Sequence, residues 1–231
     1  MRSRLPRALI IIAVIALVWC VAQAAELAGV PVPDTEQVNG KTLYLNGFGL
    51  RTFSILGVHI YVAALYLERL STDAGEIIGS PETKLLTVKF VRSITVGEAR
   101  KAWAEGLENN CTAPCRLDPE DVERFLASMP AMHVGDDYFL VFTPNGATVT
   151  SGGQLIATIS KRQFARAMLA MFLGPKPASP MLKQDLLRGH GLISAVPHGG
   201  TPGIFHPSLR EYSAGGSIIP PTGFDWRWSI S

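Results

Sequence analysis

An arginine and a tyrosine ten residues apart have the types and spacing of an anion receptor. Arg51 follows the glycine-containing segment 46–50, and Tyr61 lies in the apolar run that comes next. If the chain turns around Leu56-Gly57, the two runs pair as antiparallel strands, and Arg51 lies nearly opposite Tyr61 and Val62. The guanidinium then offers two parallel charge-assisted N–H bonds and the phenol one O–H bond, which suits a carboxylate or other oxyanion. The alternative is a solvent-facing arginine at a strand end, with Tyr61 packing by its ring.

Two further polar side chains lie close to this pair in the sequence. Strict alternation places His59 on the same face as Tyr61 and Tyr66 on the opposite face, provided that no bulge intervenes. A single histidine in an apolar strand is more often a packed, hydrogen-bonded core residue than a ligand. We therefore restrict the receptor hypothesis to Arg51 and Tyr61.

A second pair, Cys111 and Cys115, encloses three residues and favours a disulfide. A metal site would need two more ligands of matching type, and the nearest histidine in sequence, His133, stands alone. A redox centre usually has two residues between its cysteines, not three. We expect neither a metal nor a cofactor.

The first 24 residues have the pattern of a cleaved signal peptide. Three arginines precede an apolar run of about thirteen residues, and Ala22-Gln23-Ala24 supplies small residues at the cleavage positions. A membrane anchor, the alternative, needs roughly twenty apolar residues. Cleavage changes the balance from 21 basic and 19 acidic residues to 18 and 19. We expect a periplasmic or secreted chain with no membrane span after cleavage, where an oxidising compartment permits the disulfide.

The remaining sequence predicts one α+β domain at residues 38–189, an antiparallel sheet covered on one face by helices. Residues 25–37 form an N-terminal lead-in, and the Gly/Pro-rich tail 190–231 is expected to be disordered. Helix starts are marked by a capping box at Thr95 and Glu98, by Asp118-Pro119, by Ser160 and by Ser179-Pro180. The expected strands are 42–45, 50–56, 58–67, 84–92, 137–143, 146–151 and 154–158, and the expected helices are 95–109, 118–129, 161–173 and 180–188.

Several function classes find no support. The chain is 47% hydrophobic and 17% charged, and neither sign of charge gathers into a long run, so nucleic-acid binding is not expected. No dinucleotide-binding glycine motif, P-loop, nucleophile elbow or zincin motif is present.

Three stretches together resemble the chalcone isomerase fold family, and in particular its bacterial, exported chalcone isomerase-like members. They read NGFGLRTFSILGVHIYVAALYLE, VRSITVGEARKAW and FARAMLAMFLGPKPASPMLKQDLLRG, with an Asp-Asp-Tyr strand near residue 137 between the last two. The resemblance covers residues 38–189. It implies an open-faced β-sandwich: a large antiparallel sheet with helices on one face and a ligand cleft between them.

The resemblance also implies two kinds of function. Plant members cyclise chalcones, and others bind fatty acids with an arginine and a tyrosine on the carboxylate. Arg51 matches the arginine of both branches, and Tyr61 falls where the fatty-acid binders carry their tyrosine. The isomerases' catalytic tyrosine, asparagine and lysine fall at Ala99, Gly106 and Phe90, which cannot donate the hydrogen bonds that cyclisation needs.

The leading hypothesis is therefore non-catalytic binding of a fatty acid or similar amphipathic carboxylate by Arg51 and Tyr61. One alternative is an isomerase, an intramolecular lyase acting on a chalcone or other enone, with Arg51 holding the anion. Another is a structural envelope protein with no small ligand, in which an internal carboxylate would pair with Arg51.

Overall fold

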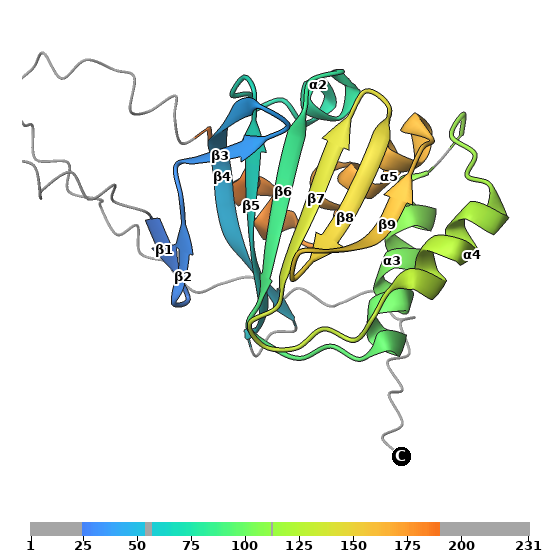
Figure 1. The fold of residues 1–231 in the computed structure, drawn as a ribbon, viewed down its shortest axis with the longest axis horizontal. Coiled ribbons are helices and arrows are strands. Elements are labelled where there is room, and N and C mark those ends of the chain that lie inside the picture. Colours follow the sequence, from blue (N-terminus) through green and yellow to red (C-terminus); the bar gives the residue numbers. More distant parts are fainter. Residues whose placement is uncertain (1–24, 54–56, 112, 190–231) are drawn as a thin grey trace, which may run out of the picture. The chain divides into compact units, whose positions relative to one another are not determined.

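Seven β-strands form one antiparallel sheet in which every strand pairs with its neighbours in sequence (Figure 1). Each connection therefore joins two adjacent strands. This holds even for β6 and β7, although two helices lie between them in the sequence. The strands are β3 (Thr35–Val38), β4 (Lys41–Phe53), β5 (Val58–Leu67), β6 (Lys84–Phe90), β7 (Asp137–Thr143), β8 (Gly146–Ser151) and β9 (Gln154–Ile159).

The structure is a computed structural model that describes residues 25–53, 57–111 and 113–189. The predicted signal peptide (1–24) and the predicted disordered tail (190–231) lie outside the described residues. So does part of the predicted turn between β4 and β5.

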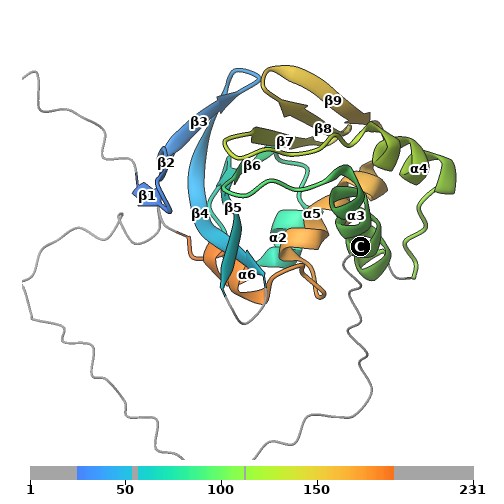
Figure 2. The same ribbon diagram turned by 90° about the horizontal axis from the view of Figure 1, so that it is seen from below.

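The sheet curls, and α2, α3, α5 and α6 lie on its concave side (Figure 2). The described helices are α2 (Ala74–Gly79), α3 (Val96–Asn110), α4 (Pro119–Ser128), α5 (Arg162–Leu173) and α6 (Pro180–Leu186). The predicted fold class, α+β with an antiparallel sheet covered by helices, is confirmed.

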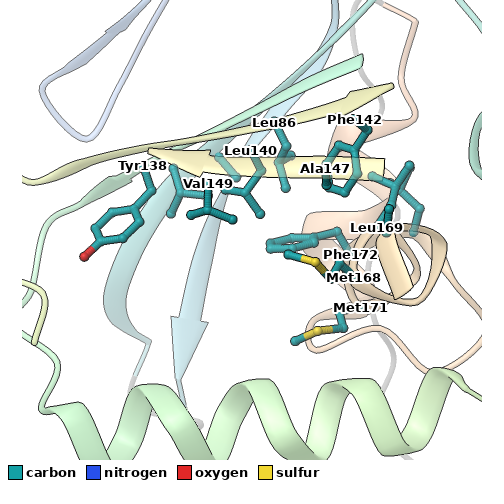
Figure 3. Close-up of a cluster of buried hydrophobic side chains, with 14 of the residues drawn as sticks. Leu86, Tyr138, Leu140, Phe142, Ala147, Val149, Met168, Leu169, Met171 and Phe172 are labelled. Carbon is teal, nitrogen blue, oxygen red and sulfur yellow. The ribbon is translucent and has the colours of Figure 1, made fainter. Parts of the chain in front are cut away.

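The main core lies between the concave face and α5. Alternate residues of β6, β7 and β8 point toward Met168, Met171 and Phe172 of that helix (Figure 3). Nine of the twelve residues of α5 are buried, so this helix is apolar on nearly every side. Four methionines belong to this core, and their unbranched, polarizable side chains fill irregular spaces. They are Met129, Met132, Met168 and Met171.

A smaller apolar cluster lies on the opposite face of β4 and β5. Leu43, Leu45 and Tyr66 are buried there against Val32, which belongs to a two-stranded sheet near the start of the described chain. That sheet consists of β1 (Ala25–Leu27) and β2 (Val30–Val32), neither of which was predicted. The predicted lead-in, residues 25–37, thus supplies this hairpin and most of β3.

Most helix starts follow their predicted signals. The capping box of Thr95 and Glu98 is complete, with both reciprocal hydrogen bonds present. The predicted cap at Ser160 is wrong: Lys161 is the N-cap of α5 and makes no side-chain capping bond. The reason is that β9 runs through Ile159, so helical geometry starts one residue later than expected. The short helix α2 was not predicted, although the Asp73 side chain caps it.

Candidate functional site

The inner face of β4 carries two glycines and then Arg51. Gly47, Gly49 and Arg51 pair with Leu65, Ala63 and Tyr61 of β5, whose side chains pack in the main core. A Cβ on Gly47 would lie 2.6 Å from the Leu186 carbonyl oxygen, and one on Gly49 would lie 2.6 Å from Asp185 Oδ2. The glycines therefore let α6 lie directly on the strand beside Arg51. This G-x-G spacing is a sequence signal of close backbone approach.

A β-bulge at Ile60 determines which β5 side chains face the site. Arg51 pairs with Tyr61, but Thr52 pairs with His59, so Ile60 is the extra residue on β5. Ile60 and Tyr61 both pack against the main core, which consecutive residues of a regular strand cannot do. His59 is exposed instead. The bulge thus removes His59 from the face of Tyr61, where uninterrupted alternation would place it.

Arg51 and Tyr61 lie directly opposite each other, as the hairpin argument predicts. The Arg51 side chain is partly buried, and its Nη1 atom is fully buried with no hydrogen-bond partner. No acidic side chain in the described part of the chain forms an ion pair with it. Buried N–H groups in native proteins are nearly always paired, so this nitrogen is an unused donor at a defined position.

The Tyr61 phenol is suited to donate a hydrogen bond beside that cation. Burial raises the pKa of Tyr61, and the positive charge of Arg51 lowers it by a smaller amount. The hydroxyl therefore keeps its proton at neutral pH. Arg51 and Tyr61 therefore carry N–H and O–H donors at paired positions of β4 and β5.

Aromatic rings continue across the sheet from Tyr61. Its ring meets Phe90 of β6 edge to face at a centroid distance of 5.5 Å, and Phe90 meets Tyr138 of β7 in the same way, also at 5.5 Å. Such pairs contribute roughly 0.5–1.5 kcal/mol each beyond their burial. They fix the Tyr61 ring, and with it the direction of the hydroxyl. In the sequence, Phe90 stood out only as a residue at the position of the isomerases' lysine, and its contact with Tyr61 was not predicted.

The three positions that correspond to the isomerases' catalytic residues hold Phe90, Ala99 and Gly106, which pack in the core or let helices approach. Phe90 and Ala99 are buried in the main core, at 7% and 3% exposure. A Cβ on Gly106 would collide with Met171, so the absence of a side chain there lets α3 and α5 approach. None of these residues carries a side-chain donor.

A family model described as chalcone isomerase-like matches residues 24–188. The chain belongs to the chalcone isomerase-like family. Among solved structures, it is similar to the crystal structure of a fatty-acid binding protein from Arabidopsis thaliana, with a TM-score of 0.60. The two are 15% identical, and the match covers 72% of this chain and 96% of the plant protein, which shows a shared fold. No curated protein sequence matches the chain.

The cysteine pair of this chalcone isomerase-like chain forms a disulfide. Cys111 and Cys115 are bonded, with their Cα atoms 5.1 Å apart, directly after α3. Within the described residues, no group of three or more His, Cys, Asp or Glu side chains is arranged to hold a metal ion. No helix in that part of the chain is long and apolar enough to cross a membrane.

Two surface hollows lie away from Arg51. One, of about 230 Å³, lies between α4 and β9 and is lined by Asp121, Phe125 and Lys161 among others. The other, of about 190 Å³, is lined by residues that include Lys84 and Arg166. Neither hollow was predictable from the sequence, because the residues that line each come from segments far apart in the chain.

Proposed function

We propose that this chalcone isomerase-like protein binds a fatty acid or similar amphipathic carboxylate, with the headgroup at Arg51 and Tyr61. The observation that supports this most is the Arg51 Nη1 atom, which is buried on the concave face without a partner. A buried donor without a partner typically costs about 1–3 kcal/mol, and a charged donor costs more. A carboxylate placed there would remove that cost, and it would accept a second hydrogen bond from the Tyr61 hydroxyl.

The tail of the ligand would supply most of the binding free energy. Burying one CH₂ group contributes about 0.8 kcal/mol, so a twelve-carbon chain offers roughly 8–10 kcal/mol before ordering costs. A charge-assisted hydrogen bond adds about 1.5–3 kcal/mol. The four methionines of the main core are the side chains best suited to rearrange around such a chain. Arg51 would then orient the ligand while the tail determines affinity.

The two alternatives have less support. An enone isomerase would need donors to replace the missing ones, and Phe90, Ala99 and Gly106 supply none. A purely structural protein would pair Arg51 with an internal carboxylate, and no such ion pair forms among the described residues. The plant protein of similar fold is a fatty-acid binding protein, which agrees with the proposed ligand class.

Export to the periplasm, or secretion, is part of the same hypothesis. Residues 1–24 carry the signal-peptide pattern, and a disulfide such as Cys111–Cys115 persists in an oxidising compartment. The mass of the chain purified from the periplasm tests this directly. We expect a product that begins at residue 25, and an uncleaved chain would contradict it.

The binding hypothesis is tested by native mass spectrometry and lipid extraction of the exported protein. We expect a co-purifying fatty acid with the wild type and its loss with Arg51→Ala. Arg69→Ala is the matched control, because Arg69 is exposed and already paired with Glu76 and Glu82. An empty wild-type protein that also fails to take up dodecanoate would contradict fatty-acid binding, and turnover of chalcone would then favour the isomerase.

A further inference from the structure

The hollow of about 190 Å³ lies between the end of α2, the turn between β7 and β8, and the first turns of α5. Lys84, Arg162 and Arg166 line it, and none of the described residues that line it is acidic. Its remaining walls are largely apolar, with Phe142 and Leu169 among them. The lining thus carries three positive charges and no negative one.

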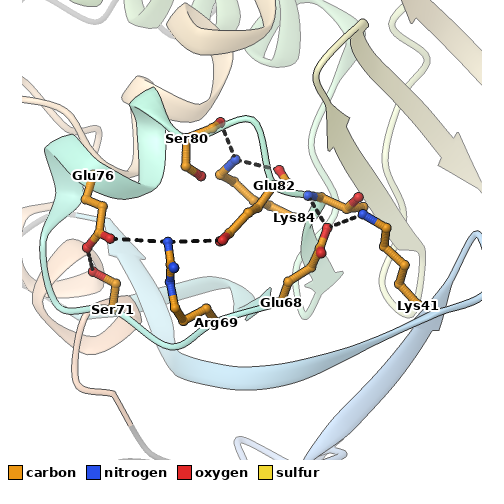
Figure 4. A network of polar contacts seen from close by, with 9 residues as sticks. Lys41, Glu68, Arg69, Ser71, Glu76, Ser80, Glu82 and Lys84 are labelled. Carbon is orange, nitrogen blue, oxygen red and sulfur yellow. Dashed lines mark hydrogen bonds and ion pairs between the residues drawn. The ribbon is translucent and has the colours of Figure 1, made fainter.

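Main-chain carbonyl groups, not carboxylates, hold these cations in place. Lys84 Nζ donates to the carbonyl oxygens of Ser80 and Glu82 at 3.0 and 2.7 Å (Figure 4). Arg162 Nε donates to a carbonyl of the β7–β8 turn at 2.9 Å, and Arg166 Nη2 to a carbonyl at the end of α2 at 2.8 Å. Such bonds orient a cation without neutralising it. They leave one Lys84 donor and four on each arginine without a partner among the described residues.

The burial of Lys84 adds to this electrostatic imbalance. The residue is only 4% exposed, and burial is the largest cause that lowers its pKa, to about 8. Two carboxylates lie near enough to raise that pKa, but both have other partners: Glu82 pairs with Arg69, and Glu68 pairs with Lys41 (Figure 4). Lys84 therefore keeps its charge in a buried position without an ion-pair partner of its own.

The start of α5 also carries an unfavourable excess of positive charge. Arg162 and Arg166 are four residues apart on one helix, so their like charges face each other. They lie in the first turns, at the positive end of the helix dipole, and the first turn contains no acidic residue. One anion bound between them would relieve this repulsion, the dipole penalty and the buried charge of Lys84 together.

We propose that this hollow is a binding site for a phosphate-type oxyanion, held by Lys84, Arg162 and Arg166. Two arginine forks and an ammonium suit an anion with several oxygens and more than one charge. The source is either a free phosphorylated small molecule or the headgroup of a phospholipid.

The site is independent of the proposed carboxylate site. Lys84 is the first residue of β6, and Phe90, which packs on Tyr61, is the last. They are six positions apart along the strand, or roughly 20 Å at 3.3 Å per residue. Failure of one hypothesis therefore leaves the other untouched.

Calorimetric titration of the full exported protein with inorganic phosphate tests the site, at pH 7 and constant ionic strength set with chloride. We expect saturable binding that weakens at least tenfold in Arg162→Gln/Arg166→Gln. The control Arg124→Gln/Arg188→Gln removes the same charge from arginines that have aspartate partners and do not line the hollow, and should change affinity less than twofold. Lys84→Met, which leaves the exposed arginines in place, should also weaken binding at least tenfold.

Flotation with phosphatidylcholine vesicles, with and without phosphatidic acid, separates the two sources. Arginine-dependent flotation with phosphatidic acid indicates a lipid headgroup, and phosphate binding without flotation indicates a free phosphorylated ligand. If phosphate binds no better than chloride, or if both double variants lose affinity equally, the site does not exist.

Discussion

Replacing Arg51 with methionine should make the empty protein more stable and should reduce the additional stability that a bound ligand provides. Arg51 keeps a buried nitrogen without a hydrogen bond, and methionine is a flexible, unbranched side chain with no N–H donor to satisfy. An unsatisfied buried donor costs about 1–3 kcal/mol. Because the Arg51 side chain is only partly buried, we use the lower half of this range, about 1–2 kcal/mol. For a chain of this size, that corresponds to a rise in Tm of roughly 2–8 °C.

Ligand binding should change in the opposite direction. Loss of the charge-assisted hydrogen bonds, about 1.5–3 kcal/mol, weakens affinity for dodecanoate by roughly 10- to 150-fold. The assay is calorimetric melting of delipidated wild type and Arg51→Met, each with and without dodecanoate. Wild type should gain about 2.7 kcal/mol at a ligand concentration of 100 Kd, and the variant should gain about 0.3–1.4 kcal/mol at that same concentration.

The control is Arg69→Met, which changes an exposed side chain and should shift stability by less than about 0.5 kcal/mol in both states. A delipidated Arg51→Met protein that melts below wild type would refute the reasoning. It would mean that the guanidinium has a structural partner and is not an unused receptor group.

Three further predictions concern Tyr61, Gly47 and Lys84. Tyr61→Phe should weaken dodecanoate binding about fivefold in a calorimetric titration, the value of one hydrogen bond, and a loss as large as that of Arg51→Met would contradict this division. Gly47→Ala should lower the free energy of unfolding in urea by about 1–3 kcal/mol, because its Cβ would overlap the backbone of α6. Gly79→Ala, where nothing lies within 4 Å, should not destabilise the protein. Lys84 has a folded pKa of about 8 against 10.5 when unfolded, so the unfolded state binds more protons between these values. Wild-type stability should therefore rise from pH 8 to 10.5 relative to Lys84→Met, by at most about 3 kcal/mol, and parallel pH profiles would contradict it.

The sequence was sufficient for elements whose pattern is local. Strands β5 and β6 read as apolar runs, and the capping box at Thr95 marks the start of α3 directly. The prediction for β4 was wrong: two strands, 42–45 and 50–56, were expected with a break at 46–49, but Lys41–Phe53 is one strand that keeps its pairing with β5 through a bulge at Asn46. The length of the hairpin places Arg51 close to Tyr61, and the bulge at Ile60 then makes the two residues direct partners. By contrast, β1 and β2 have three residues each and become ordered by packing on the outer face of the sheet, a tertiary effect that no local pattern contains.

The candidate site was predictable in its residues but not in its surroundings. The bulge at Ile60 depends on how β5 meets β4, so alternation alone left the position of His59 open. The unpaired state of Arg51 Nη1 depends on every element around it. Lys84 and Arg166 lie 82 positions apart and meet only because α5 packs beside the start of β6.

The hairpin of β4 and β5 contains two bulges, one on each strand, and they cancel. In an antiparallel pair the two residue numbers have a constant sum. Here that sum rises by one after Asn46 on β4 and returns to its first value at Ile60 on β5. The segment from Gly47 to Arg51, with its partners, is therefore one frame out of step with the pairing on either side. Sliding this segment along its partner would require both bulges to move at once, so each fixes the position of the other. Deleting either residue alone would shift the frame, and every side chain beyond that point would turn to the other face of the sheet.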